Sequence, residues 1–402
     1  MRKGEVVTPH VLIFPLPLQG PVNCMLKLAE LLAINELHVT FLNTEFIQDR
    51  LLKHTHVQSR FHNYLGFKFE TVPDGLPEDH PRTGDKFMDI ANGIEEAAKP
   101  LFKEMLTDGK LSSKSSSPVT FIIADGFYSF AIDIAKGAGV PLLYFDTISP
   151  CSLWTFFCLP RLIELGEVPF KEEDYDRKVK GVAESENFLR YRDLPSFFRT
   201  SDLNERIIQL ILQEVKEIPR SEGMILNTSE HIDGPIISQL STICPNTYPI
   251  GPLHALHKSI LHSAQIASPL ASPSNSLWED DKSCMTWLDA QPQKSVIYVS
   301  IGSLAVMKVD QVMELWHGIV NSGKRFLWSQ RPGSLDDHDR VTIEKAVREI
   351  MEDKKDEFQS SASMMAKLAT QSIADQGGSS RYNFNRLVED IRMMSLRTPA
   401  HD

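Results

Sequence analysis

The first 150 residues alternate short apolar segments with longer segments of helical periodicity. Strand-like runs occupy residues 10–14, 38–43, 67–72, 119–125 and 141–146, and helical segments include residues 21–32, 86–105 and 131–138. Parallel strands that are covered on both faces have nearly continuous apolar sequences. Consecutive parallel strands are joined by a crossover connection, which is usually a helix. The pattern therefore predicts an α/β fold built on a parallel sheet with helices on both faces.

Polar residues stand where several of these strands end. Asp125 closes one strand, residues 146–147 close the next, and residues 14–19 lead from the first strand into a helix. In open α/β sheets, ligands bind beyond the carboxyl ends of the strands, and a helix N-terminus placed there attracts anionic groups. We therefore expect the functional site at this edge of the sheet.

A second region begins after a Ser- and Pro-rich segment at residues 263–276, which we interpret as linker. Strand patterns at residues 222–228 and 247–253 precede it, and strand patterns at 296–300 and 325–331 flank a helix at 309–321. From residue 341 to 394 the sequence is helical and charged. We divide the chain into an N-terminal domain (1–250), an interdomain linker (251–280) and a C-terminal part (281–402) whose two strands are too few for an independent sheet.

Bulk composition narrows the classes of function. The 402 residues carry a formal net charge of −11 without a Lys/Arg tract, which argues against nucleic acid as a partner. Five cysteines without C-x-x-C spacing indicate neither a disulfide framework nor a zinc site. Because no run approaches the length of a membrane span and no secretory signal pattern is found, we expect a cytoplasmic protein.

A series of motifs stands in order along the chain: "HVLIFPLPLQG", "FETVPDGLPEDHPRTGD", "FIIADGFYSFAIDIA", "SEGMILNTSEHI", "TYPIGPLH", "CMTWLDAQPQKSVIYVSIGSLAVM" and "RFLWSQRPGSL". Together they resemble the plant UDP-sugar-dependent glycosyltransferases of family 1, and most of all the branch that glucosylates iridoids such as 7-deoxyloganetic acid. The resemblance runs from residue 11 to about residue 335 and resumes from about 340 to 395.

The resemblance implies the GT-B architecture, in which two Rossmann-like domains face each other across a cleft. It implies that the N-terminal domain binds a small acceptor and the C-terminal domain binds UDP-glucose, the co-substrate. An acceptor oxygen then attacks C1 of the sugar with inversion while UDP leaves, and no metal or other cofactor takes part. Such a site needs a base near the acceptor hydroxyl and hydrogen-bond donors near the diphosphate.

This sequence departs from the family pattern at two places. The family's general base is a His in the turn after the first strand, and Pro21 stands at that position. Between Ser334 and Arg340 the sequence also lacks the strands, helices and signature box that hold the nucleotide sugar in the family. We therefore expect an internally truncated C-terminal domain that is poorly folded, and impaired glucosyl transfer. The alternative is a catalytically inactive protein that binds the acceptor or another partner.

Carrying the family motifs over residue by residue assigns a set of site residues, as the resemblance implies. The set comprises Asp125 as the catalytic carboxylate; Gly20, Pro21 and Phe127 for the acceptor; and Thr147, Gly302 and Ser303 for the donor. Structural roles compete with each assignment: helix caps for Asp125 and Ser303, a turn hydroxyl for Thr147, and core packing for Phe127 and Trp154. A nicotinamide-dependent dehydrogenase is disfavoured because no G-x-G-x-x-G follows the first strand. The sequence leaves the oligomeric state open.

Overall fold

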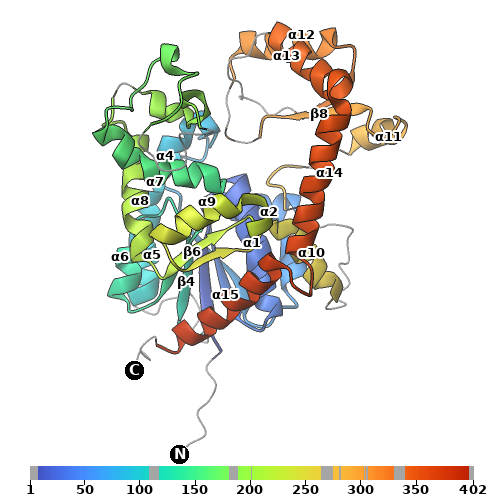
Figure 1. Cartoon of the computed structure of the whole chain (residues 1–402). Coiled ribbons are helices and arrows are strands. Elements are labelled where there is room, and N and C mark those ends of the chain that lie inside the picture. The colour runs from blue at the N-terminus through green and yellow to red at the C-terminus, as the bar shows by residue number, and fades with distance from the viewer. Residues whose placement is uncertain are drawn as a thin grey trace, which may run out of the picture.

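The structure is a computed structural model that describes residues 8–107, 117–180, 189–200, 202–263, 275–279, 282–302, 304, 307–329 and 340–397. Its centre is a seven-stranded sheet in the order β3-β2-β1-β4-β5-β6-β7, and every neighbouring pair is parallel (Figure 1). The strands are β1 His10–Phe14, β2 His38–Thr44, β3 Phe67–Val72, β4 Phe121–Asp125, β5 Leu142–Asp146, β6 Gly223–Leu226 and β7 Thr247–Pro249. The predicted parallel α/β sheet is confirmed.

Helices cover both faces of this sheet, as predicted. They are α1 Gln19–Ile34, α2 Glu45–His54, α3 Val57–Phe61, α4 Phe87–Gly93, α5 Lys99–Thr107, α6 Ala131–Gly137, α7 Pro150–Glu164, α8 Arg206–Glu217, α9 Glu230–Ile243 and α10 Leu253–Ser263. Alternate residues of β1 enter different cores, because successive side chains of a strand point to opposite faces. Leu12 and Phe14 pack with α4 to α9, whereas Val11 and Ile13 pack with α1, α2 and α10.

Two predicted helices differ in detail from the observed ones. Helix α1 begins at Gln19 rather than at Pro21, and its first backbone bond runs from the Val22 N–H to the Leu18 carbonyl. Pro21 therefore lies among the first N–H positions, which have no intrahelical partner in any helix, so it removes no bond. The helix predicted at residues 86–105 is realised as α4, a π-helical turn at Ile94–Ala98, and α5.

The chain ends in a helix that belongs to the large sheet's packing. Helix α15 (Ser379–Ser395) lies against β7, with Leu387 and Ile391 fully buried in the same core as α1. Tyr248 donates a hydrogen bond to Asp390 (2.8 Å), and Arg392 donates to the Asn35 carbonyl (2.9 Å). Residues distant in sequence thus close one face of the sheet.

A smaller lobe holds the second sheet. Its two parallel strands, β8 (Val296–Ser300) and β9 (Arg325–Ser329), lie with α11 (Ser283–Asp289), α12 (Val309–Asn321) and α13 (Arg340–Arg348). The long helix α14 (Lys355–Ser372) joins this lobe to the rest of the molecule (Figure 1). The prediction of two strands in this part holds for the described residues.

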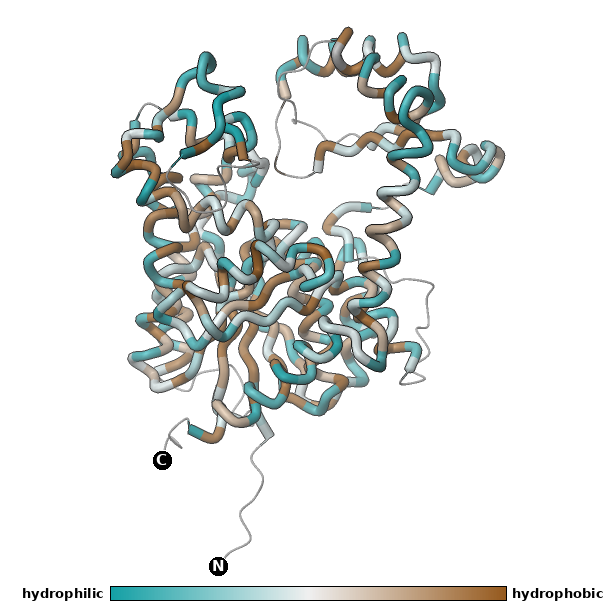
Figure 2. Tube along the Cα trace, in the orientation of Figure 1, coloured by the Kyte–Doolittle hydropathy of each residue, from teal (hydrophilic) through white to brown (hydrophobic). Residues whose placement is uncertain are grey.

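The two sheets differ in how well they are covered. Every residue of β1, β4 and β5 is buried, whereas no residue of β8 or β9 is, and Tyr298 is 66% exposed. Figure 2 shows the hydrophobic residues concentrated along the central strands of the large sheet. Parallel strands are normally covered on both faces, so the small sheet lacks packing that its architecture requires.

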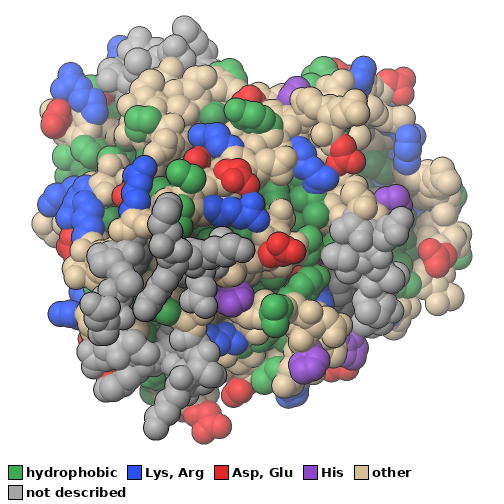
Figure 3. All heavy atoms as spheres, turned by 90° about the horizontal axis from the view of Figure 1, so that it is seen from below, with side chains coloured by type: hydrophobic (Ala, Val, Ile, Leu, Met, Phe, Trp, Pro, Cys, Tyr) green, Lys and Arg blue, Asp and Glu red, His purple; other side chains and the backbone are tan. Residues whose placement is uncertain are grey.

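The surface carries charges of both signs. In the view from below, Lys, Arg, Asp and Glu side chains of the described residues are interspersed rather than gathered in one patch (Figure 3). Among the described residues, no helix has the length and apolar character needed to cross a membrane.

Candidate active site

The carboxyl ends of β1, β4 and β5 meet at the centre of the large sheet. Strand β1 lies between β2 and β4, so the order of the strands reverses there, which is where α/β sheets open a ligand crevice. The structure brings Asp125 at the end of β4 and Thr147 directly after β5 to this edge, together with Gly20 and Pro21 in the first turn of α1. Four of the site residues assigned from the sequence therefore share one edge of the sheet.

Asp125 is buried at this edge, with 3% of its surface exposed. Its Oδ1 accepts a hydrogen bond from the Phe127 N–H (3.2 Å), and its Oδ2 meets no donor among the described residues. The next helix, α6, begins at Ala131 with Phe130 as its N-cap, so Asp125 does not cap it. A buried carboxylate with an oxygen left over is typical of a functional position rather than a structural one.

Two further carboxyl groups lie beside Asp125. Asp146 ends β5, Glu214 lies on the buried side of α8, and both are almost fully buried. Burial and the charge of Asp146 raise the pKa of Asp125 to about 8. Burial also raises the pKa of Asp146 to about 6, although a hydrogen bond from Glu214 opposes the rise. The edge is therefore a site where protons bind more tightly than they do to ordinary carboxylates.

Phe127 lines a small apolar pocket beside the strand ends. Its ring meets that of Phe87 edge to face at a centroid distance of 5.6 Å, and Leu16 from the end of β1 completes the wall. The pocket holds about 20 Å³, roughly the space of one or two water molecules. A ligand larger than this must therefore widen the pocket. Trp154 is 5% exposed inside the core, which agrees with core packing.

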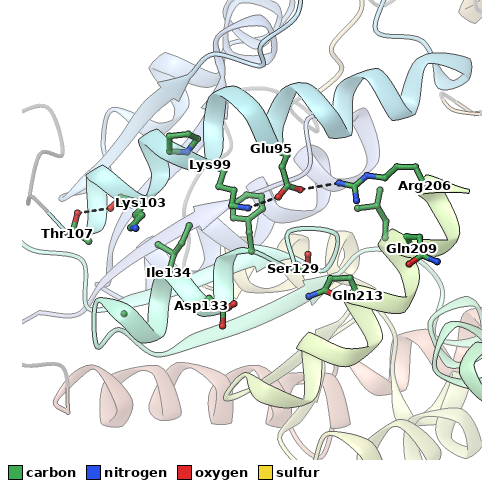
Figure 4. Close-up of a pocket in the computed structure, with 14 residues that line it drawn as sticks. Glu95, Lys99, Lys103, Thr107, Ser129, Asp133, Ile134, Arg206, Gln209 and Gln213 are labelled. Atoms are coloured by element: carbon green, nitrogen blue, oxygen red, sulfur yellow. Dashed lines mark hydrogen bonds and ion pairs between the residues drawn. The ribbon is translucent and has the colours of Figure 1, made fainter. Parts of the chain in front are cut away.

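A larger, open pocket of about 950 Å³ lies between α5, α6 and α8. Glu95 forms ion pairs there with Lys99 (2.6 Å) and Arg206 (3.4 Å), as Figure 4 shows. The larger pocket shares the lining residues Glu95, Phe130 and Leu210 with the small apolar pocket. The two pockets therefore adjoin, and the larger one opens beside the small one.

The first turn of α1 holds a later segment of the chain, residues 275–277. The Gln19 side chain donates to the Asn275 carbonyl (3.3 Å) and accepts from the Leu277 N–H (2.7 Å). Arg50 donates to the Leu277 carbonyl (3.1 Å) and stacks over the Trp278 ring. Residues 275–278 are therefore fixed against the large domain at the edge where the site lies.

Of the donor residues assigned from the sequence, Gly302 lies in the other lobe. It follows β8 with a φ of +81°, a conformation that glycine adopts readily, and it is exposed. Two residues later, the Leu304 carbonyl oxygen would lie 1.7 Å from a Cβ placed on Gly84 of the large domain. The turn after β8 therefore touches the large domain at a glycine. Ser303 lies outside the described residues.

Sequence reasoning did not identify Glu214. Its signal was present, because Leu210, Ile211 and Val215 are buried on the same side of α8, which makes residue 214 an acidic side chain on an apolar face.

Within the described ranges, no three His, Cys, Asp or Glu side chains are grouped so that they could hold a metal ion. All five cysteines are free.

Comparison with known proteins gives a consistent result. The chain is 41% identical to a 7-deoxyloganetic acid glucosyltransferase of Catharanthus roseus, over 97% of this chain and 98% of that one. Its fold matches the crystal structure of Os79 from O. sativa in complex with UDP (TM-score 0.74, 20% identity, 95% and 100% covered). It also matches the Medicago truncatula protein UGT71G1 complexed with UDP-glucose (TM-score 0.72, 18% identity, 96% and 98% covered). No protein-family model matches the chain.

Proposed function

Because this chain belongs to the plant UDP-glycosyltransferases of family 1 and has their GT-B fold, we propose that it is a UDP-glucose-dependent glucosyltransferase homologue for a small iridoid- or monoterpenoid-like acceptor. The observation that carries the proposal is the 41% identity to an iridoid glucosyltransferase over nearly the whole chain. The apolar pocket at Phe127, next to a carboxylate with a free oxygen, supports the acceptor class. UDP-glucose is the co-substrate, and no metal or other cofactor enters the proposed reaction.

In the proposed reaction, Asp125 is the base. The acceptor hydroxyl gives its proton to Asp125 Oδ2, its oxygen forms a bond to C1 of glucose, and the bond from C1 to the UDP oxygen breaks. UDP leaves with the electron pair, on the face opposite the attack. Pro21 has no atom that accepts a proton. Since Oδ2 is sealed from solvent, the acceptor or a bridging water has to open the wall beside it.

A site that lacks the family's His suits an acceptor whose oxygen is already acidic, such as a hemiacetal or a carboxylate. Base strength and acceptor acidity together set the driving force of proton transfer. With such an acceptor, the missing His has little effect on the rate, and Asp125 or a water molecule suffices. Thr147, Gly302 and Ser303 are proposed to meet the donor, and Gly20, Pro21 and Phe127 to meet the acceptor.

We expect Pro21→His to leave glucosyl transfer to an acidic acceptor unchanged or lower. The change breaks no helix bond, because the residue lies in the first turn of α1. Initial rates with a hemiacetal aglycone and with a simple alcohol test this, and Pro21→Ala controls for loss of the proline ring. A large gain for Pro21→His across ordinary alcohols would contradict the proposal.

The donor side of the molecule is proposed to be incomplete, so that transfer is impaired. The alignment to the Catharanthus relative spans 478 positions and therefore exceeds the 402 residues of this chain by 76. The partly exposed strands β8 and β9 support a loss from the second sheet, which we place between residues 334 and 340, outside the described residues. We retain the division into residues 1–250, 251–280 and 281–402 as a proposal.

The second candidate function is acceptor binding without catalysis. It is favoured by the contrast between the fully covered large sheet and the exposed small one, since the acceptor side has its core and the donor side does not. In that case the chain binds an aglycone, or another partner, through the pocket at Phe127.

Calorimetric titration of the full chain with UDP-glucose and with an iridoid aglycone, alongside mass spectrometry of the products, separates these functions. Slow glucoside formation with weak donor binding supports the impaired transferase. Aglycone binding with neither donor binding nor product supports the binding protein. Tight donor binding and fast turnover would contradict the proposed loss on the donor side.

A further inference from the structure

Three buried carboxyl groups from three elements meet beneath the proposed site. Asp125 ends β4, Asp146 ends β5 and Glu214 comes from α8, with exposures of 3%, 2% and 1%. A Cβ placed on Gly126 would lie 2.6 Å from Asp146 Oδ2 and 2.7 Å from Glu214 Oε1. Both oxygens therefore approach one point, and a glycine next to Asp125 leaves the room for them.

The electrostatics of this arrangement favour one proton between Asp146 and Glu214. Neither Asp146 Oδ2 nor either oxygen of Glu214 meets a hydrogen-bond partner among the described residues, and Asp146 Oδ2 and Glu214 Oε1 both approach the position of a Cβ on Gly126. An ionised carboxylate only accepts hydrogen bonds, so the donor between them is a carboxyl proton. Burial and the nearby charge of Asp146 raise the pKa of Glu214 well above its usual range, which assigns the proton to Glu214 and the negative charge to Asp146.

We propose that Asp146 is a positioning residue for glucosyl transfer: with Glu214 holding the shared proton, its negative charge makes neighbouring Asp125 a stronger proton acceptor. The inference rests on the proposed role of Asp125 as the base. The proposed reaction needs a base stronger than an ordinary carboxylate, because an ordinary carboxylate takes up a hydroxyl proton poorly. Pro21 cannot act as the base instead. Catalysis favours a base whose pKa lies near the working pH, as that of Asp125 does at about 8.

The other titratable groups that face Asp125 do not compensate this charge. Cys24 faces it from α1 and Tyr128 from the turn after β4, and burial raises the pKa of both side chains, so both are neutral near pH 7. Glu214 faces it from α8 as a protonated acid, and Tyr144 faces Glu214 from β5. None of these groups is a cation, which leaves Asp146 as the charge among them that acts on Asp125.

The test compares Asp146→Asn with Glu214→Gln in the full chain. Infrared spectroscopy of protonated carboxyl groups between pH 5 and 9 follows Asp125, and Asp125→Asn identifies its band. Asp146→Asn removes the charge, so we expect the pKa of Asp125 to fall by about 1 to 2. Glu214→Gln keeps both a donor to Asp146 and the charge of Asp146, so the midpoint of Asp125 stays close to that of the unaltered chain.

Stability gives a second readout that does not depend on activity. Asp125, Asp146 and Glu214 bind protons more tightly in the folded than in the unfolded chain, so the free energy of unfolding falls as the pH rises above about 4. We expect both substitutions to flatten this fall, Glu214→Gln through the loss of its own bound proton and Asp146→Asn in part through the lower pKa of Asp125. Asp146→Glu, which retains the charge, replaces Asp146→Asn if the latter fails to fold, and its Asp125 midpoint should match that of the unaltered chain.

The outcomes separate this inference from the function it rests on. An unchanged Asp125 midpoint in Asp146→Asn overturns the inference alone, as do equal shifts in Asp146→Asn and Glu214→Gln. A shifted midpoint, together with a pH profile of product formation that moves to lower pH by the same amount, supports it. Transfer that does not respond to Asp125→Asn overturns the proposed base, and the positioning role with it, even where the midpoint shifts.

Discussion

Inserting the donor segment that we propose to be missing should raise glucosyl transfer more than any single substitution. We expect insertion of the corresponding segment of the Catharanthus roseus relative between residues 334 and 340 to increase the catalytic efficiency by about 10²–10³-fold or more. Each preorganised donor aimed at charge that develops in a transition state contributes about that factor, and the segment would supply several donors to the diphosphate. Product formation with UDP-glucose and an iridoid aglycone, measured by mass spectrometry, checks the increase.

The matched control is a Gly/Ser insert of the same length at the same place. It restores the spacing without the donor contacts, so its rate should stay at that of the unaltered chain. The graft should also protect β8 and β9, none of whose residues is buried now, and proteolysis of residues 275–402 should slow. An unaltered chain that already turns over as fast as the graft would refute the proposed impairment.

Glu30→Gln should lower the free energy of unfolding by about 3–5 kcal/mol, because it breaks a buried charge network. Glu30 Oε1 accepts hydrogen bonds from Arg60 Nε (3.0 Å) and the Tyr64 hydroxyl (2.9 Å), and Oε2 meets Arg60 and His257. The change leaves the Arg60 guanidinium, 11% exposed, without its counter-charge. Urea unfolding at pH 7 measures the loss, and exposed Glu96→Gln is the control.

The effect should depend on pH in a defined direction. Burial alone would raise the pKa of Glu30, but hydrogen bonds from His257 and Arg60 outweigh it and hold the pKa at about 2. A carboxylate with a lowered pKa stabilises the fold above its unfolded pKa, and that stabilisation disappears as the pH falls through the folded value. The difference between the unaltered chain and Glu30→Gln should therefore shrink between about pH 4 and pH 2. A constant difference would show that packing, not charge, is lost.

The pattern of apolar residues was sufficient to predict most of the fold. Strands β1 and β3 have the predicted bounds, and the other strands of the large sheet begin or end within two residues of theirs, or four for β7. Short apolar runs identify buried strands because side-chain burial follows the period of the local structure. The start of α1 was misplaced, since Pro21 is equally well tolerated at several positions of a first helical turn.

The site was predictable only in part. Asp125 and Thr147 could be assigned to one edge because the carboxyl ends of parallel strands meet there. The proximity of Asp146 and Glu214 could not be predicted from the sequence. The pattern of an amphipathic helix shows which of its faces is buried, but not which strand end that face will contact. The size of the small apolar pocket could not be predicted either, because it depends on how Leu16, Phe87 and Phe127 pack together.

The sequence by itself determined the parallel sheet, the two-strand C-terminal region, the absence of a His at the turn and, through its motifs, the family. These properties are local or lie in the order of motifs along the chain. Only the tertiary structure decided which distant titratable groups lie close together, such as Glu30 and His257, and that α15 completes the core around α1. The reason is physical: burial and proximity set the pKa of a carboxyl group, and both arise only when segments far apart in the chain pack together.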